Sequence, residues 1–168
     1  MAQESTPESA GSARPFKYHG KQGEFTMIAP LRPGGAEKMR EIQRVADETF
    51  PEISGAIDSI GTLHNLRIAL FDNDTRMLFA ASYDGTWDQY IDDFVAASVA
   101  GNLRFLDEIF GTFEGFPGFQ SSDVKDYLVK YQVPVGFFWT AYPETTADRI
   151  QRGERVLGGV EQVLDAAG

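Results

Sequence analysis

Three side chains that can take part in binding or proton transfer lie close together in one short run: His64, Asn65 and Arg67. An arginine guanidinium binds a carboxylate or an enolate oxygen through charge-assisted hydrogen bonds. An imidazole, with an ordinary pKa of about 6.5, exchanges a proton close to neutral pH. We therefore predict that His64 and Arg67 are catalytic residues and that Asn65 helps to hold a substrate.

Two of these residues also have a purely structural interpretation. Arg67 would then pair with an acidic residue across a dimer interface, and His64 would be a hydrogen-bonded structural histidine. In the strand predicted over residues 62–71, strict alternation places His64 on the side of Leu66 and places Asn65 and Arg67 on the opposite side. An arginine and an asparagine in an otherwise apolar strand suit a face that lines a partly wet interior.

Aromatic side chains supply the expected walls of a binding pocket. The predicted substrate contacts of this kind are Tyr83, Trp87, Phe116 and Trp139. Aromatic walls suit a flat apolar ligand, and they suit a dry dimer interface equally well. Phe116 belongs to a glycine-punctuated loop, which is interpreted either as a mobile lid or as a loop fixed to the core by its phenylalanines.

The composition excludes several kinds of chemistry. The 168 residues include 25 acidic and 15 basic side chains, two histidines and no cysteine. Disulfides, thiolate nucleophiles and iron–sulfur ligation are therefore excluded, and a histidine-rich metal site is hard to build. A formal net charge of −10 argues against nucleic acid and against a membrane surface as partners. Since no secretory signal or membrane span is recognisable, we predict a cytoplasmic protein.

Acidic residues gather near the start of a helix predicted from Thr86. Carboxylates in the first turn of a helix interact favourably with its dipole, which explains Asp84 and Asp88 without a ligand. The spacing of Asp84, Asp88, Asp92 and Asp93 lacks the regular ligand pattern of a calcium loop. We therefore predict no metal site.

The chain divides into two segments of different composition. Residues 1–23 are rich in small and polar side chains and bury too little apolar surface to fold alone. They are predicted to be a leader that is flexible or bound to a partner subunit, and their mildly basic charge against an acidic body favours the second arrangement. Residues 24–168 are expected to form one domain.

The spacing of apolar residues predicts an alternation of strands and helices. Strands are expected over 25–31, 62–71, 76–83 and 133–142, and helices over 36–50 (ending at Pro51), 86–97, about 103–110, 122–130 and 146–166. Without the insertion at 100–120, the order is βαββαβ, a ferredoxin-like α+β fold with helices on one face of an antiparallel sheet. The other face must then be covered by a second copy, a partner or a ligand.

Four local sequences resemble dye-decolourising-peroxidase-like domains of the dimeric α+β barrel superfamily. They are Gly61–Arg67, Tyr83–Phe94, Glu114–Pro117 and Ala141–Pro143, and the second is the most specific. The resemblance covers nearly everything from Glu24 onward. It implies a homodimer in which two sheets face each other and enclose an interior that holds haem, an aromatic compound or nothing functional.

The sequence departs from true dye-decolourising peroxidases at the residues that hold haem. Those enzymes carry a Gly-x-x-Asp-Gly motif and a proximal histidine in the C-terminal half. Here Ala81 stands at the first glycine of the motif that ends with Asp84 and Gly85, and no histidine follows His64. We therefore expect no cofactor, with haem on an atypical ligand such as His64 or a tyrosine as the alternative.

Two functions remain open at this point. The first is an oxidoreductase, peroxidase-like or cofactor-free, that oxidises or rearranges a small apolar or aromatic compound held between sheet and helices. The second is a binding or assembly domain without catalysis, in which a partner fills the open face of the sheet. The length of the chain favours neither.

Overall fold

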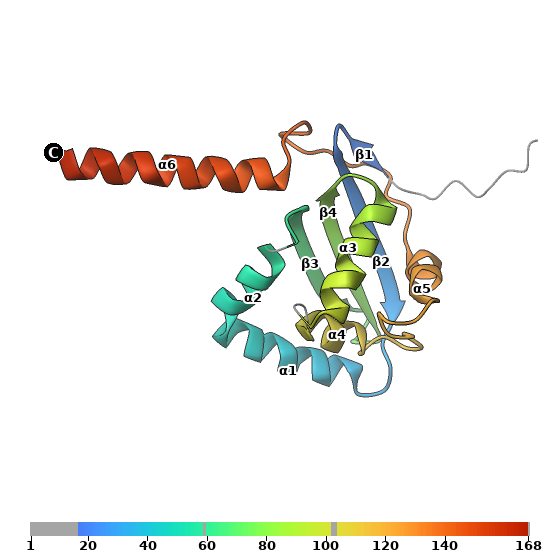
Figure 1. Ribbon diagram of the computed structural model, residues 1–168. Coiled ribbons are helices and arrows are strands. Elements are labelled where there is room, and N and C mark those ends of the chain that lie inside the picture. The colour runs from blue at the N-terminus through green and yellow to red at the C-terminus, as the bar shows by residue number, and fades with distance from the viewer. Residues whose placement is uncertain (1–16, 59, 102–103, 168) are drawn as a thin grey trace, which may run out of the picture.

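Residues 17–58, 60–101 and 104–167 are described by the computed structural model of the chain (Figure 1). Its sheet has the order β1-β2-β4-β3, and all three pairings are antiparallel. The strands are β1 Tyr18–His19, β2 Gln22–Pro30, β3 Leu63–Phe71 and β4 Arg76–Asp84. The sheet therefore begins inside the segment predicted as a leader, of which residues 1–16 lie outside the described residues.

The helices follow the strands in groups, and helices lie on one face of the antiparallel sheet (Figure 1), as predicted for the α+β class. Figure 1 shows α3 crossing that face, with α4 and α1 near its lower end. The helices are α1 Gly35–Glu48, α2 Phe50–Asp58, α3 Trp87–Val99, α4 Arg104–Phe110, α5 Val124–Tyr131 and α6 Ala147–Ala167. In the described part of the chain, no helix is both long and apolar enough to span a bilayer.

The hydrophobic core lies between the sheet and the helices and is rich in aromatic rings. Alternate residues of β2 and β4, such as Phe25 and Phe79, point into it and are almost fully buried. The ring of Phe110 lies 4.9 Å from that of Phe79, 5.3 Å from that of Phe116 and 4.9 Å from that of Phe119. The glycine-punctuated loop is thus fixed to the core by its phenylalanines.

Local sequence signals set two of the connections. The hairpin between β3 and β4 places Asp72, Asn73 and Asp74 at φ values of 51°, 50° and 65°, a region that Asp and Asn tolerate better than most residues. Thr86 begins α3 with a capping box, in which its hydroxyl accepts from the Gln89 backbone N–H. The predicted hairpin and the predicted helix cap at Thr86 are thus confirmed.

The prediction that one helix ends at Pro51 is wrong. The first helix ends at Glu48, and α2 begins at Phe50 with Pro51 in its first turn. Proline is tolerated there because the first N–H groups of a helix have no intrahelical acceptor.

The predicted strand over residues 133–142 is also wrong, because these residues form no strand. Residues 132 and 133 do pair with β2. Gln132 forms a bridge with Met27, and the Val133 N–H donates to the Thr26 carbonyl at 2.9 Å. Pro134 then has no N–H with which to continue the ladder.

The chain returns to the sheet further on. The Thr140 N–H donates to His19 Nδ1 at 3.2 Å, and the Lys21 N–H donates to the Pro143 carbonyl at 2.8 Å. We call residues 132–143 the edge segment. Both of its ends are bonded to β1, β2 or the turn between them, whereas its middle has no backbone hydrogen bond to the sheet among the described residues.

The aromatic core generates a stability prediction. Phe110 is 1% exposed and contacts several rings, so Phe110→Ala should lower the free energy of unfolding by about 3–5 kcal/mol. Phe50, which is 63% exposed, provides the control, and Phe50→Ala should stay within about 0.5 kcal/mol of wild type. Urea unfolding followed by circular dichroism measures both, and equal losses would contradict this account of the core.

Candidate functional site

A groove of about 400 Å³ lies between the edge segment and the face of the sheet opposite the helices. Alternation along β2, β3 and β4 brings their polar residues to this face, while the apolar residues between them enter the core. The lining residues are Glu24, Thr26, Asn65, Arg67, Ala81, Ser82, Val135, Phe137, Phe138 and Trp139.

The groove brings together three residues that the sequence singled out. Asn65 and Arg67 come from β3, on the face predicted for them, and Trp139 comes from the edge segment. The Asn65 amide donates to the Ser82 hydroxyl on the neighbouring strand β4. Arg67 is exposed and forms no hydrogen bond or ion pair with any described residue. Its guanidinium is therefore free to bind an anion in the groove.

Glu24 is a groove residue that the sequence interpretation missed. It is only 4% exposed, and its Oε2 accepts from the Thr26 hydroxyl at 3.0 Å. Its Oε1 has no hydrogen-bond partner in the part of the chain that the structure describes. Burial raises the pKa of this carboxyl above its ordinary value, against smaller opposing effects of its hydrogen bonds with the Thr26 hydroxyl and the Lys17 backbone. The predicted strand began at Phe25, one residue too late to show that Glu24 and Thr26 share a face.

Three consecutive residues of the edge segment, Phe137, Phe138 and Trp139, form the aromatic wall of the groove. Phe137 and Trp139 are 81% and 64% exposed, whereas Phe138 is half-buried. These side chains stand beside the sheet because the segment leaves the β2 ladder at Pro134 and is bonded to the sheet again only at Thr140, whose N–H donates to the His19 side chain. The wall is therefore a consequence of the interrupted pairing.

His64 does not line the groove, and the prediction for its face is wrong. The pairing of β3 with β4 shifts between Leu63, opposite Tyr83, and Asn65, opposite Ser82. This irregularity breaks the strict alternation, so Leu63 packs against the core as Leu66 does. His64 Nε2 instead lies 2.8 Å from Asp84 Oδ1.

Asp84 uses its second carboxylate oxygen at the start of α6. Its Oδ2 accepts from the Ala147 backbone N–H at 2.7 Å, and the residue is 8% exposed. Asp84 therefore joins the end of β4, His64 and the first turn of α6, which supports the structural interpretation of His64.

Tyr83 and Trp87 lie in the core rather than at the groove. They are 0% and 2% exposed, and the Tyr83 ring stacks on that of Tyr90 at a centroid distance of 4.2 Å. Burial raises the pKa of the Tyr83 hydroxyl well above its ordinary range. Neither side chain forms a wall of the groove.

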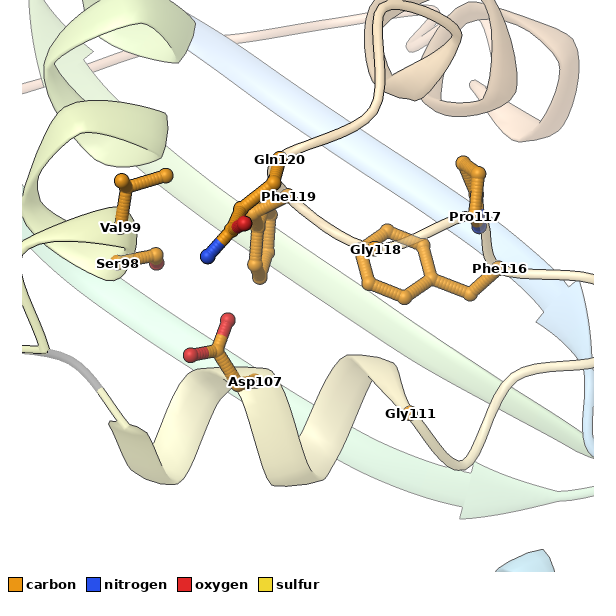
Figure 2. Close-up of a pocket in the computed structure, with 9 residues that line it drawn as sticks. All are labelled: Ser98, Val99, Asp107, Gly111, Phe116, Pro117, Gly118, Phe119 and Gln120. Carbon is orange, nitrogen blue, oxygen red and sulfur yellow. The ribbon is translucent and has the colours of Figure 1, made fainter.

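Phe116 lines a separate cavity of about 440 Å³ on the helix side (Figure 2). The picture shows the Asp107 carboxylate and the Gln120 amide directed toward the same space. Burial raises the pKa of Asp107, and no arginine, lysine or histidine belongs to the lining. This cavity is therefore less suited to an anion than the groove.

The residues of the groove do not fit haem. Among the described residues, its lining contains no histidine, tyrosine or methionine, so a haem iron would find none of the usual axial ligands there. His64 is bonded to Asp84, and His19 accepts from Thr140 at the end of the edge segment. Among the described residues, no three histidine or acidic side chains are grouped to hold a metal ion.

Comparisons with known proteins bear on the fold alone. No protein-family model matches the chain, and no curated protein matches it. Among solved structures, the chain is similar to a protein from Nitrosomonas europaea with the provisional name of antibiotic biosynthesis monooxygenase. The two are 14% identical, with a TM-score of 0.39 over 60% of this chain and 86% of that one. The α+β assignment rests on the strand order and pairing described above.

The raised pKa of Glu24 generates a prediction for stability. The folded carboxyl holds its proton to higher pH than the unfolded one, so its contribution to stability is fully present below the ordinary pKa of 4.5 and is lost as pH rises through the folded pKa. Glu24→Gln, which stays neutral, should be more stable than wild type at neutral pH.

The difference between the two proteins should disappear below about pH 4.5. Urea unfolding across this pH range measures it, with Glu52→Gln at the exposed start of α2 as the control that changes little. A Glu24→Gln protein that is less stable than wild type at neutral pH would contradict the direction of the shift.

Proposed function

We propose that the protein binds a small aromatic or apolar compound in the groove and holds an anionic oxygen of that compound with Arg67. The unpaired guanidinium of Arg67 within an aromatic groove carries this proposal. A carboxylate or enolate oxygen accepts two N–H bonds from one guanidinium, and the Asn65 amide lies on the same strand as a further polar group. The rings of Phe137 and Trp139 supply the apolar contact.

Charge and shape together favour this class of ligand. The protein is acidic overall, with a net charge of −10. Arg67, which has no ion-pair partner among the described residues, places a positive charge in the groove of this acidic protein. A groove that is open to solvent and lined on one side by exposed rings admits a flat molecule without movement of the core. Peroxidase chemistry on haem is not part of the proposal, because no histidine lines the groove.

Removing the guanidinium tests this function. Arg67→Met keeps an unbranched apolar stem and removes the guanidinium, so benzoate and 1-naphthoate should bind about 10- to 100-fold more weakly than to wild type. Isothermal titration calorimetry measures the dissociation constants. Arg44→Met removes a cation that pairs with Glu48 on the exposed side of α1 and should leave binding unchanged. Unchanged binding in Arg67→Met would remove this residue from the site.

A second candidate function is assembly, and α6 favours it. This 21-residue helix projects away from the body in Figure 1. Ile150, Leu157, Val160 and Leu164, the predicted apolar line, are all between 40% and 65% exposed. The helix also contains three glycines, each of which costs about 1 kcal/mol relative to alanine, so packing must supply its stability.

The occupant that we propose for this apolar line is α6 of a second copy. Ile150, Leu157 and Leu164 repeat every seven residues, which is the spacing of a two-helix seam. Arg149 and Glu154 flank the seam on opposite sides and are five residues apart. In a parallel pair, Arg149 of one helix therefore lies beside Glu154 of the other, and the charges are complementary.

A charge placed in the seam tests the assembly. Leu157→Asp should convert a dimer into a monomer, because the seam would bury two unpaired carboxylates at its centre. Gln162→Asp adds the same charge on the opposite side of α6 and should leave the dimer intact. Size-exclusion chromatography with light scattering gives the masses. A monomeric wild type, or a dimer that survives Leu157→Asp, would contradict the proposal.

A further inference from the structure

We propose that Glu24 accepts a proton from the compound bound in the groove, and that this compound is a weak oxygen acid whose anion is held by Arg67. This inference rests on the proposed function of the groove. It adds a proton acceptor to the site and narrows the class of ligand.

The first support is the incomplete bonding of a buried carboxyl. Glu24 lines the groove and is only 4% exposed, and a hydroxyl, that of Thr26, donates to its Oε2. Among the described residues, no hydrogen-bond partner lies within reach of its Oε1. No cation within 4.0 Å balances its charge among the described residues. A proton delivered to the free oxygen would remove a buried, uncompensated charge, which is a favourable change.

The second support is that Arg67 lines the same groove. When the ligand O–H bond breaks, the proton moves to Glu24 Oε1 and the electron pair stays on the ligand oxygen. The negative charge then lies on an atom that Arg67 can bind, rather than on a buried carboxylate with no cation within 4.0 Å among the described residues. The transfer needs no oxidant or reductant, and the net charge of the complex does not change.

The third support is the chemistry of the acid. A carboxylic acid reaches the groove already ionised at neutral pH and needs no acceptor. An enol or a phenol arrives neutral, and a carboxylate with a raised pKa is a suitable acceptor for its proton. The ligand class is therefore a weak oxygen acid with an apolar body. His64, which the sequence suggested for this role, is bonded to Asp84 and does not line the groove.

Three other charged or titratable groups surround Glu24. Arg67 lines the groove from β3, Lys17 precedes β1 and its carbonyl accepts from the Glu24 backbone N–H at 3.1 Å, and Tyr83 lies on β4. The pKa of Tyr83 is raised, so its hydroxyl stays protonated in the range of interest. Among these groups, Glu24 is the one carboxyl.

The experiment uses 4-nitrophenol as the probe and the full chain as the protein. At a pH below the pKa of the free phenol, the compound is colourless in solution, and its phenolate is yellow. Binding to wild type should produce the yellow band without net exchange of protons with the buffer, because the proton stays in the complex on Glu24. Visible absorbance gives the ionisation state, and calorimetry in two buffers of different ionisation enthalpy gives the protons exchanged.

Glu24→Gln is the informative variant, because glutamine has the shape of the protonated acid but accepts no proton. It should bind the phenolate and release one proton per ligand to the buffer. Its apparent affinity should therefore fall about tenfold for each unit of decreasing pH, over a range in which wild type binds with constant affinity.

Thr26→Val is a second variant that leaves the carboxyl in place. It removes the hydroxyl that donates to the Glu24 carboxylate and so favours the protonated form. The affinity for 4-nitrophenol is constant only above the pH at which Glu24 of the free protein is ionised. In Thr26→Val this lower limit should lie at a higher pH than in wild type.

The outcomes separate the two proposals. Colourless binding of 4-nitrophenol to wild type, or equal proton release by wild type and Glu24→Gln, overturns the role of Glu24 while benzoate binding still supports the groove. Failure of both 4-nitrophenol and benzoate to bind wild type overturns the proposed function and this inference with it. Yellow binding that is lost in Arg67→Met, and that releases a proton only in Glu24→Gln, supports both.

Discussion

The missing N–H of Pro134 interrupts pairing along the free edge of β2, and the candidate site depends on that interruption. Residues before Pro134 are bonded to Thr26 and Met27, and the chain is held again from Thr140 to Pro143. A continuous strand would have placed the aromatic residues between these points in alternation above and below the sheet. Instead they stand beside it and form one wall of a groove.

Two opposite charges share this groove without an ion pair between them. Glu24 is buried with one unbonded oxygen, and Arg67 is exposed on β3. In an ordinary protein interior, oppositely charged side chains are paired, because an isolated buried charge costs several kcal/mol. Because they are not paired, Glu24 is available to accept a proton and the Arg67 guanidinium is available to donate hydrogen bonds to an anion. One small acid can satisfy both, which is the physical basis of the proposed function and of its extension to Glu24.

The same edge segment also determines where α6 starts. Its C-terminal end is fixed through Lys21 and Gln22, and the first N–H of α6 is bonded to Asp84, which also holds His64. These contacts direct α6 away from the body, as Figure 1 shows, and leave its apolar line exposed. The groove and α6 are therefore built from consecutive parts of the chain.

Local patterns in the sequence determined the α+β class, the hairpin at 72–75, the cap at Thr86 and the face that carries Asn65 and Arg67. Each depends on periodicity or on residue preferences that act over a few neighbouring positions. Only the tertiary structure decided three features: the side of the sheet to which His64 belongs, the absence of a strand over 133–142, and the burial of Glu24. A bulge in the pairing of β3 moved His64, and Pro134 broke a run whose apolar composition otherwise favoured a strand. Glu24 is buried by segments distant in sequence, and alternation along one strand carries no information about what covers it.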